Sequence, residues 1–182
     1  MEDRRETFYH ERIRQSGPQY AGFDLLSSEA TLNLLYTYDV FHQLATHYMA
    51  EYGLSKSTLN VLMVLRHGSP GGMQLHDLGE LLLVSKANIT GLIDHLEAKG
   101  LVKRSIGTHD RRARFARITR KGEALLDKFV PVHYGNVSRL LGDLTEHDKQ
   151  MLIKLLKKTR ASLVANSEEL AQRSGVQASM SE

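Results

Sequence analysis

The sequence predicts a mainly α-helical fold that contains one small β-hairpin. Apolar residues recur at the helical period over most of the chain. Residues 101–118, in contrast, have the composition of two short strands joined by a Gly-containing turn. With 182 residues, of which 41% are hydrophobic and 25% charged, the chain can bury a core, so we expect one compact unit with flanking arms.

Residues 1–22 form a polar segment of mixed charge, in which Gly17-Pro18 ends any helix that begins before it. We expect this segment to be a frayed, polar N-terminal arm. The alternative is that its apolar side chains dock on a partner subunit; these are Phe8, Tyr9 and Ile13.

Residues 23–54 contain one long helix, which runs from Leu25 to Tyr52 and ends at Gly53. A wide apolar stripe follows it, formed by Leu34, Leu35, Tyr38, Phe41, Leu44, Ala45 and Tyr48. The helix contains no Lys or Arg, and its charged side chains are acidic. This end of the chain is therefore not expected to face nucleic acid.

Residues 55–119 begin with two more helices, from Thr58 to His67 and from Leu75 to Leu82. The stretch between them, Gly68 to Gly72, lacks the Gly-Lys-Ser/Thr ending of a phosphate-binding loop and indicates a turn. Gly79 costs the short helix about 1 kcal/mol relative to alanine, which indicates a close approach to the next helix.

The stretch from Ser85 to Gly100 is the centre of the predicted unit. Ser85 is placed to cap a helix by accepting from the backbone N–H of Asn88, and Gly100 closes that helix. One face is apolar, with Ile89, Leu92, Ile93 and Leu96, and the other carries Lys86, Asn88, Thr90, Gly91, Asp94 and His95. Such a helix fits a DNA major groove, although an ordinary amphipathic helix with a solvated face has the same pattern.

The segment behind this helix decides between the two interpretations. Residues 101–106 and 111–118 are predicted strands of a β-hairpin whose turn is 107–110. Eight of the chain's 24 Lys and Arg lie in the nineteen residues from Lys103 to Lys121, against one acid, Asp110. Like charges on neighbouring strands repel, and a bound polyanion would offset that cost. A groove-sized helix followed by a basic hairpin is the layout of a winged helix-turn-helix.

Residues 120–166 continue with two helices. Thr119 caps the first, which runs from Arg120 to about Leu141 and which Pro131 should kink. Thr145 and Asp148 open the second as a capping box. Residues 167–182 are polar, and we expect them to be a disordered tail.

The composition excludes several classes of protein. The absence of cysteine excludes disulfides, thiolate zinc sites and thiol-based redox sensing. The absence of an 18-residue apolar run and of a signal peptide predicts a cytoplasmic protein without a membrane partner. No Gly-x-Ser-x-Gly elbow, dinucleotide fingerprint or His-Glu-x-x-His motif occurs, so we expect no enzymatic activity, no catalytic residue, no cofactor and no metal.

The order of the elements and two motifs resemble the MarR family of bacterial transcription regulators over roughly Leu25–Leu163. The segment from Asp110 to Gly122 is similar to the family's wing, which has Asp-x-Arg and then an apolar-Thr-x-x-Gly ending. The segment from Ser85 to Val102 is similar to its recognition helix. Two positions depart from the pattern: Leu83 stands where the family often has a turn glycine, and His95 replaces a frequent arginine.

The resemblance implies a homodimer on a pseudo-palindromic double-stranded DNA operator, with dimerisation helices in 23–54 and 120–166 and the DNA-binding module in 55–119. The sequence supports a dimer independently, because three long apolar-striped helices flank a module too small to cover them. The resemblance also implies repression relieved by a small-molecule effector, for which Tyr38, His42 and His133 are candidate ligands.

The candidate DNA-binding residues lie on the polar face of the central helix and in the wing; they are Ser85, Lys86, Asn88, Thr90, Gly91, His95, Arg104, Asp110, Arg111, Arg112 and Arg114. The resemblance implies that Arg112 enters the minor groove and that Asp110 orients neighbouring arginines.

Two alternative functions stay open at this point. A winged-helix module can bind another protein, although its wing would not need eight cations. Nine histidines also allow a metal-responsive regulator, but their spacing forms no ligand motif. His76 and Glu80 could begin a metal site only with further ligands.

Overall fold

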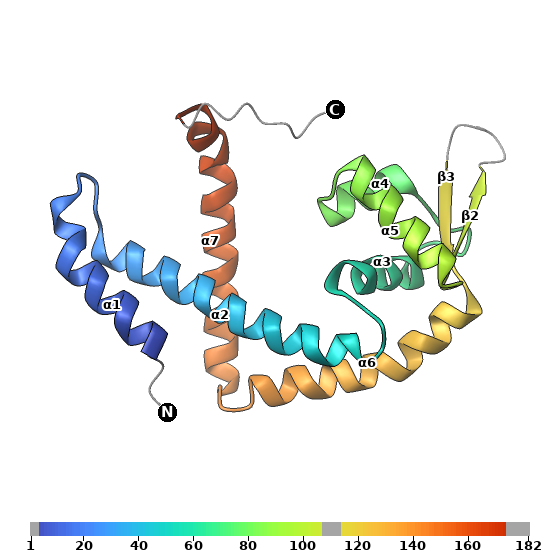
Figure 1. The fold of residues 1–182 in the computed structure, drawn as a ribbon, viewed down its shortest axis with the longest axis horizontal. Coiled ribbons are helices and arrows are strands. Elements are labelled where there is room, and N and C mark those ends of the chain that lie inside the picture. The colour runs from blue at the N-terminus through green and yellow to red at the C-terminus, as the bar shows by residue number, and fades with distance from the viewer. Residues whose placement is uncertain (1–3, 107–113, 174–182) are drawn as a thin grey trace. The chain divides into compact units, whose positions relative to one another are not determined.

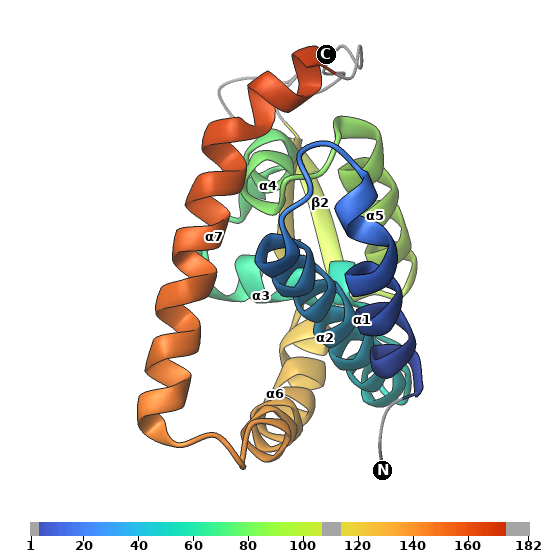
Figure 2. The ribbon, with the colours of Figure 1, turned by 90° about the vertical axis from the view of Figure 1, so that its left-hand side faces the viewer.

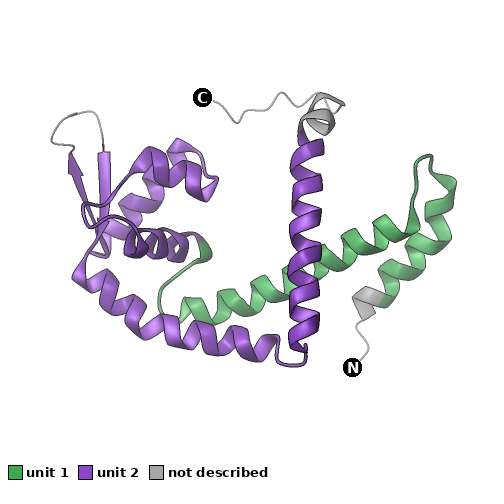
Figure 3. Cartoon of the chain, turned by 180° about the vertical axis from the view of Figure 1, so that it is seen from behind, with its two compact units in different colours: residues 1–56 green, residues 57–182 purple. Residues whose placement is uncertain are grey.

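The computed structural model of the protein describes residues 4–106 and 114–173, and side chains from 7–106 and 114–167. The chain divides into two compact units, residues 1–56 and 57–182 (Figure 3). The first unit contains the helices α1 (Arg4–Ser16) and α2 (Leu25–Ala50), with a 3-10 turn (Gly17–Gln19) between them.

The N-terminal arm is helical, which corrects the expectation that it frays. Helix α1 is held to α2 by Arg14, whose Nε donates to Glu29 Oε1 at 2.8 Å. Asn33 of α2 also contacts the His10 ring at 3.3 Å. The helix ends where expected, since Gly17 is buried against the Phe23 ring and a Cβ there would lie 2.2 Å from Phe23 Cζ. The Arg14–Glu29 ion pair joins two separate helices, so no local sequence pattern predicted that α1 would be held in place.

Helix α2 confirms the long helix predicted for residues 23–54. Asp24 caps it by accepting from the Ser27 N–H at 2.7 Å, and at its other end the Leu54 N–H reaches Met49 O at 3.1 Å. Gly53 adopts φ 64°, the left-handed conformation that favours glycine. Ala45 and Met49 are buried and Tyr48 is half-buried, but the other large members of the apolar stripe are exposed, with Leu35 at 56%.

The second unit contains the predicted helices and hairpin in the predicted order (Figure 1). From α3, which begins at the unit boundary, the elements are α3 (Lys56–His67), β1 (Met73–Gln74), α4 (Leu75–Leu82), α5 (Lys86–Ala98), β2 (Val102–Ile106), β3 (Arg114–Ile118), α6 (Arg120–Leu140) and α7 (Glu146–Arg173). The fold is therefore mainly α-helical with a small β-sheet, as the sequence predicts.

The sheet has one strand more than the predicted hairpin. Its order is β1-β3-β2, and β1 pairs antiparallel with β3 through Met73 opposite Ala116. The preceding Gly72 has φ 91°, and a Cβ there would lie 2.4 Å from Ala116 O, so this position requires glycine. A two-residue strand shows no alternation of polar and apolar residues, which explains why the sequence did not reveal it.

The core of this unit lies between α3, α4, α5, the sheet and the start of α6. Its largest fully buried side chains are Val61, Leu62, Leu78, Ile89, Ile93, Leu96, Val102, Leu126 and Phe129. Helix α5 packs against both α4 and β2. Figure 1 shows α4 beside α5, and Figure 2 shows β2 beside α5. This packing fixes α5 with its apolar stripe inward and its polar face outward.

The junction between α5 and α6 is closely hydrogen-bonded. The Thr119 hydroxyl accepts from the Gly122 N–H at 3.2 Å and donates to Gly100 O at 2.7 Å. Lys121 Nζ donates to Lys99 O at 2.8 Å. Thr119 thus caps the start of α6, as predicted, and also satisfies a carbonyl at the end of α5.

Helix α6 continues through Pro131, and α7 begins with the predicted capping box. The Thr145 hydroxyl accepts from the Asp148 N–H at 3.2 Å, and Asp148 Oδ2 accepts from the Thr145 N–H at 3.0 Å. Helix α7 extends to Arg173, beyond the predicted tail boundary at residue 167. Glu, Leu, Ala and Gln at 168–172 are good helix formers, and this propensity accounts for the longer helix.

None of the helices in residues 4–106 and 114–173 has the length and apolar composition needed to cross a membrane.

Candidate nucleic-acid interface

Helix α5 is fixed at both ends by the caps that its sequence predicts. The Ser85 hydroxyl accepts from the Asn88 N–H at 3.3 Å. At the other end, the Gly100 N–H reaches Glu97 O at 2.8 Å and the Leu101 N–H reaches Leu96 O at 2.9 Å, which is a Schellman motif. The position and length of the helix are therefore set by its own residues.

The outer face of α5 exposes the polar side chains that the sequence singled out; Lys86, Asn88, Thr90, Gly91, Asp94 and His95 are all exposed. A Cβ on Gly91 would meet nothing within 4 Å, so the helix surface is open there. The Thr90 hydroxyl donates to Lys86 O at 2.8 Å, which leaves it an acceptor for any ligand. Asn88 and Lys86 lie in the first turn, where backbone N–H groups also favour anions.

The turn between α4 and α5 contains a leucine in a strained conformation. Leu83 has φ 53° and ψ 46°, and its side chain is 85% exposed. The Val84 N–H bonds to Gly79 O at 2.9 Å, and a Cβ on Gly79 would be 3.2 Å from Val84 O and 3.6 Å from Ile89. The predicted close approach at Gly79 is confirmed.

The strands of the wing have the predicted pairing. Residue Val102 lies opposite Ile118, and the register continues to Ile106 opposite Arg114. Arg114 is exposed near the outer end of β3. Asp110, Arg111 and Arg112 lie outside the described residues, so the structure gives no placement for these three candidates.

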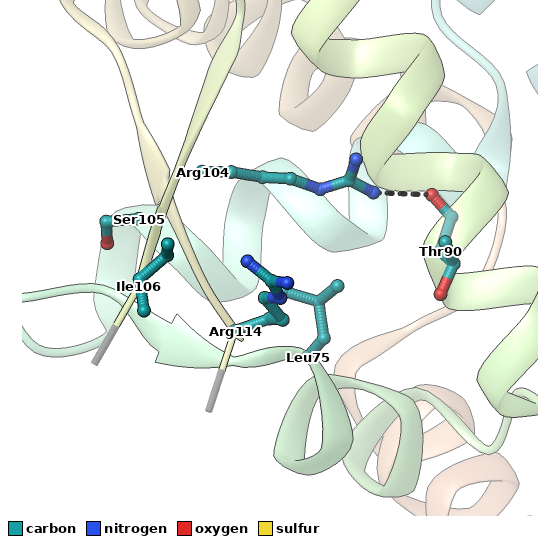
Figure 4. A pocket seen from close by; sticks show the side chains of 6 residues that line it. All are labelled: Leu75, Thr90, Arg104, Ser105, Ile106 and Arg114. Atoms are coloured by element: carbon teal, nitrogen blue, oxygen red, sulfur yellow. Dashed lines mark hydrogen bonds between the residues drawn. The ribbon is translucent and has the colours of Figure 1, made fainter. Parts of the chain in front are cut away.

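Arg104 is bound to α5. Its guanidinium pairs with Asp94 through Nη1, and its Nη2 donates to Thr90 O at 3.1 Å (Figure 4). Glu97 Oε2 lies 3.7 Å from Nη1, and Glu97 Oε1 accepts from the Arg104 backbone N–H at 2.9 Å. Sequence reasoning placed Arg104 among the DNA-binding cations and assigned no role to Asp94 or Glu97, because the contact joins residues seven to fourteen positions apart across two element types.

A cleft of about 390 Å³ lies between α5, the outer part of the sheet and the start of α4. It is lined by Leu75, Thr90, Arg104, Ser105, Ile106 and Arg114 (Figure 4). Of its two guanidinium groups, that of Arg104 is paired with Asp94, so Arg114 supplies the positive charge that suits the cleft to anions. No sequence pattern indicated that Leu75, Ser105 and Ile106 line it, because their proximity depends on the packing of three elements.

The candidate effector residues lie in two groups. On α2, the rings of Tyr38 and His42 are 5.5 Å apart, and Lys56 Nζ is 5.4 Å from the Tyr38 ring centre. On α6, the His133 ring stacks on Phe129 at 5.6 Å, and burial lowers the His133 pKa. His133 belongs to the second unit, whereas Tyr38 and His42 belong to the first.

No group of three His, Asp or Glu side chains is positioned to hold a metal ion within the described part of the chain. On α4, His76 Nε2 lies 3.3 Å from Glu80 Oε1.

Comparisons with known proteins agree with this architecture. The model of the MarR family matches residues 52–113. The transcriptional repressor YetL of Bacillus subtilis is 31% identical over 147 residues, which cover 81% of this chain and 88% of YetL. The regulator MhqR of the same organism is 33% identical over 108 residues, which cover 59% of this chain and 73% of MhqR.

Two solved structures share the fold. The MarR family regulator AbsC of Streptomyces coelicolor has a TM-score of 0.69 at 26% identity, over 75% of this chain and 93% of AbsC. MepR of S. aureus, solved as a complex with DNA, has a TM-score of 0.66 at 20% identity, over 74% of this chain and 97% of MepR.

Proposed function

Because this chain belongs to the MarR family of transcription regulators, we propose that it is a homodimeric, sequence-specific DNA-binding repressor that a small-molecule effector releases. The observation that carries the proposal is the exposed polar face of α5, held in place by two caps beside a basic wing. YetL is a transcriptional repressor, and this similarity supports repression as the output.

Helix α5 has the dimensions of a major-groove reader. Its 13 residues span roughly 20 Å, and a major groove admits one such helix. The Asn88 amide can pair bidentately with an adenine, which is worth about 1–3 kcal/mol of discrimination against a wrong base. In this proposal Arg112 of the wing enters the minor groove, where groove width and A·T content are read.

The dimer would bury apolar surface that a single chain exposes. Large apolar side chains are exposed along α2 and α7; examples are Leu35 and Phe41 on α2, and Leu155 and Leu163 on α7. Contiguous exposed apolar surface of this kind marks protein–protein interfaces. We therefore assign residues 23–54 and 120–166 to dimerisation and 55–119 to DNA binding. Light scattering at micromolar concentration should give a dimer mass, and a monomer would contradict the assignment.

The two α5 helices of such a dimer should enter successive major grooves, roughly 34–36 Å apart. Selection of duplexes from a random-sequence library should then yield a pseudo-palindrome. Asn88→Ala should relax the preference at one base position per half-site and leave non-specific binding nearly unchanged. Arg112→Ala should weaken binding to all sequences. If Asn88→Ala weakened every site equally, the assignment of α5 as reader would be wrong.

The DNA-binding proposal also predicts a steep dependence on salt. Each phosphate contact contributes about −0.9 to the slope of log K against log salt, and two wings should give a slope of at least about −4. A winged helix that binds protein instead would show a flat dependence.

The effector part of the proposal has its own test. Tyr38, His42 and His133 are candidate contacts, because two of them pair on α2 and the third is partly buried on α6. A thermal-shift screen of phenolic acids should find a ligand whose stabilisation is lost in Tyr38→Ala or His133→Ala. If the ligand still stabilised both variants, neither Tyr38 nor His133 would be an effector contact.

A further inference from the structure

We propose that Arg104 is a positioning residue, which holds the wing to the reading helix and does not itself bind DNA phosphate. The proposal deepens the proposed function, and its DNA-binding part rests on it. The observation is that the Arg104 guanidinium already has partners on α5, unlike Arg114, for which the described residues offer no ion-pair partner.

The contacts of Arg104 join two different parts of the second unit. Arg104 lies on β2, while its partners Asp94, Glu97 and the Thr90 carbonyl all belong to α5. Both the guanidinium and the backbone N–H of Arg104 bind Glu97. The side chain is only 29% exposed, whereas a phosphate-binding arginine needs its guanidinium free. Arg104 therefore closes a polar link between the strand and the helix.

The contacts between Arg104 and α5 lie close to where the sheet narrows from three strands to two. Strand β1 pairs with β3 only through Met73–Ala116 and Gln74–Phe115, and Arg104 is opposite Ala116 in the other ladder. Beyond the next pair, Ser105 opposite Phe115, the described wing consists of two strands, with Ile106 opposite Arg114. A two-stranded hairpin is at best marginally stable by itself. The Arg104 contacts thus restrain the hairpin where the third strand ends.

The Arg104–Asp94 ion pair also changes the charge on the polar face of α5 that DNA would approach. Asp94 is 57% exposed on the polar face of α5 and would repel a phosphate backbone. Pairing with Arg104 neutralises it locally. Arg104 therefore contributes to binding by keeping Asp94 paired and by holding the cations of the wing in place.

Arg104 could either bind DNA phosphate or position the wing. Asp94→Ala should change the affinity for DNA in opposite directions in these two cases. If Arg104 bound phosphate, Asp94→Ala would strengthen binding, because it removes a repelling carboxylate and frees a cation. If Arg104 positions the wing, Asp94→Ala should weaken binding about threefold to fivefold, the size expected when one partly exposed ion pair is lost while the contacts of Arg104 with Glu97 and the Thr90 carbonyl remain.

The experiment measures affinity for the duplex that the wild-type protein enriches from a random-sequence library. The variants are Asp94→Ala, Arg104→Gln, their combination, and Arg104→Lys. Arg104→Lys keeps the charge but cannot bridge Asp94 and the Thr90 carbonyl, so it should lose nearly as much affinity as Arg104→Gln. The combined variant should lose far less than the product of the two single losses. Lys103→Gln is the matched control: it removes one charge from the opposite face of the same strand and should cost at most about twofold.

A second measurement requires no DNA. Amide hydrogen exchange in β2 and β3 should become faster in Asp94→Ala and Arg104→Gln and stay unchanged in Lys103→Gln, while circular dichroism confirms that all variants are folded. Unchanged exchange in the first two variants would overturn the positioning role. Tighter DNA binding by Asp94→Ala, or wild-type affinity in Arg104→Lys, would also overturn it. If the wild-type protein enriched no duplex, the proposed function would fail, and exchange alone would still decide whether Arg104 restrains the wing.

Discussion

Replacing Leu83 by glycine should stabilise the protein, although it removes a whole side chain. Leu83 adopts the left-handed conformation, with φ 53°, in the turn between α4 and α5. For a residue with a Cβ this conformation costs about 1–2 kcal/mol. Its side chain is 85% exposed, so little apolar burial is lost with it.

The expected gain follows from two opposing effects. Glycine removes the strain but adds about 0.5–1 kcal/mol of backbone entropy to the unfolded state. The net stabilisation for Leu83→Gly is therefore about 0.5–1 kcal/mol. Leu81 provides a matched control, since it is also exposed, at 60%, but lies inside α4 with helical backbone. Leu81→Gly should destabilise by about 1 kcal/mol.

Urea unfolding followed by circular dichroism measures both changes, with protein concentration held constant. The informative result is that the change in the free energy of unfolding has opposite signs for Leu83→Gly and Leu81→Gly, although the two positions are only two residues apart. If Leu83→Gly destabilised the protein as much as Leu81→Gly, the strain assigned to this turn would not exist.

Three further predictions concern packing, capping and acid. Gly122→Ala should destabilise by about 1–3 kcal/mol in thermal or urea unfolding, because its Cβ would lie 2.4 Å from Leu101 O, which is itself held by the Thr119 N–H. Ser85→Ala should cost about 1 kcal/mol by the same assays, because it removes the α5 cap, and Ser85→Asp should not. Hydrogen bonds from the Thr145 side chain and backbone lower the Asp148 pKa below its ordinary value. The stability that this carboxylate contributes is therefore complete above the ordinary Asp pKa of about 4 and is lost as the pH falls through its lower folded pKa. Asp148→Ala should accordingly lower the melting temperature at pH 7 and change it little at pH 2.

The sequence predicted those features whose causes are local. The caps at Ser85, Thr119 and Thr145 each depend on groups within three residues, and all three are confirmed by hydrogen bonds. The apolar stripe of α5 was also predictable, because helical periodicity determines which side chains share a face. The exposure of Lys86 and Asn88 followed from the same periodicity.

The features that the sequence did not predict depend on contacts between distant residues. Helix α1 is secured by Arg14 and Glu29, fifteen positions apart, and β1 consists of only two residues. The binding of Arg104 to α5 was missed for a related reason. An arginine in a basic segment has the same sequence signature whether it faces DNA or a carboxylate of its own fold, and only the packing of β2 on α5 distinguishes the two.

Hydrogen bonds at Thr119 and Lys121 join the end of α5 to the start of α6, so we expect the two helices to move together. Because the Thr119 hydroxyl and Lys121 Nζ bond to the carbonyls of Gly100 and Lys99, directly after α5, we expect a rotation of α6 to move α5 with it. Helix α5 extends roughly 20 Å from this pivot, so a tilt of about 10° displaces its far end by about 3.5 Å. That displacement is about the rise of one base pair, 3.4 Å. A ligand that shifts α6 by this small angle would therefore move Asn88 away from the base that we propose it reads, without contacting the outer face of α5.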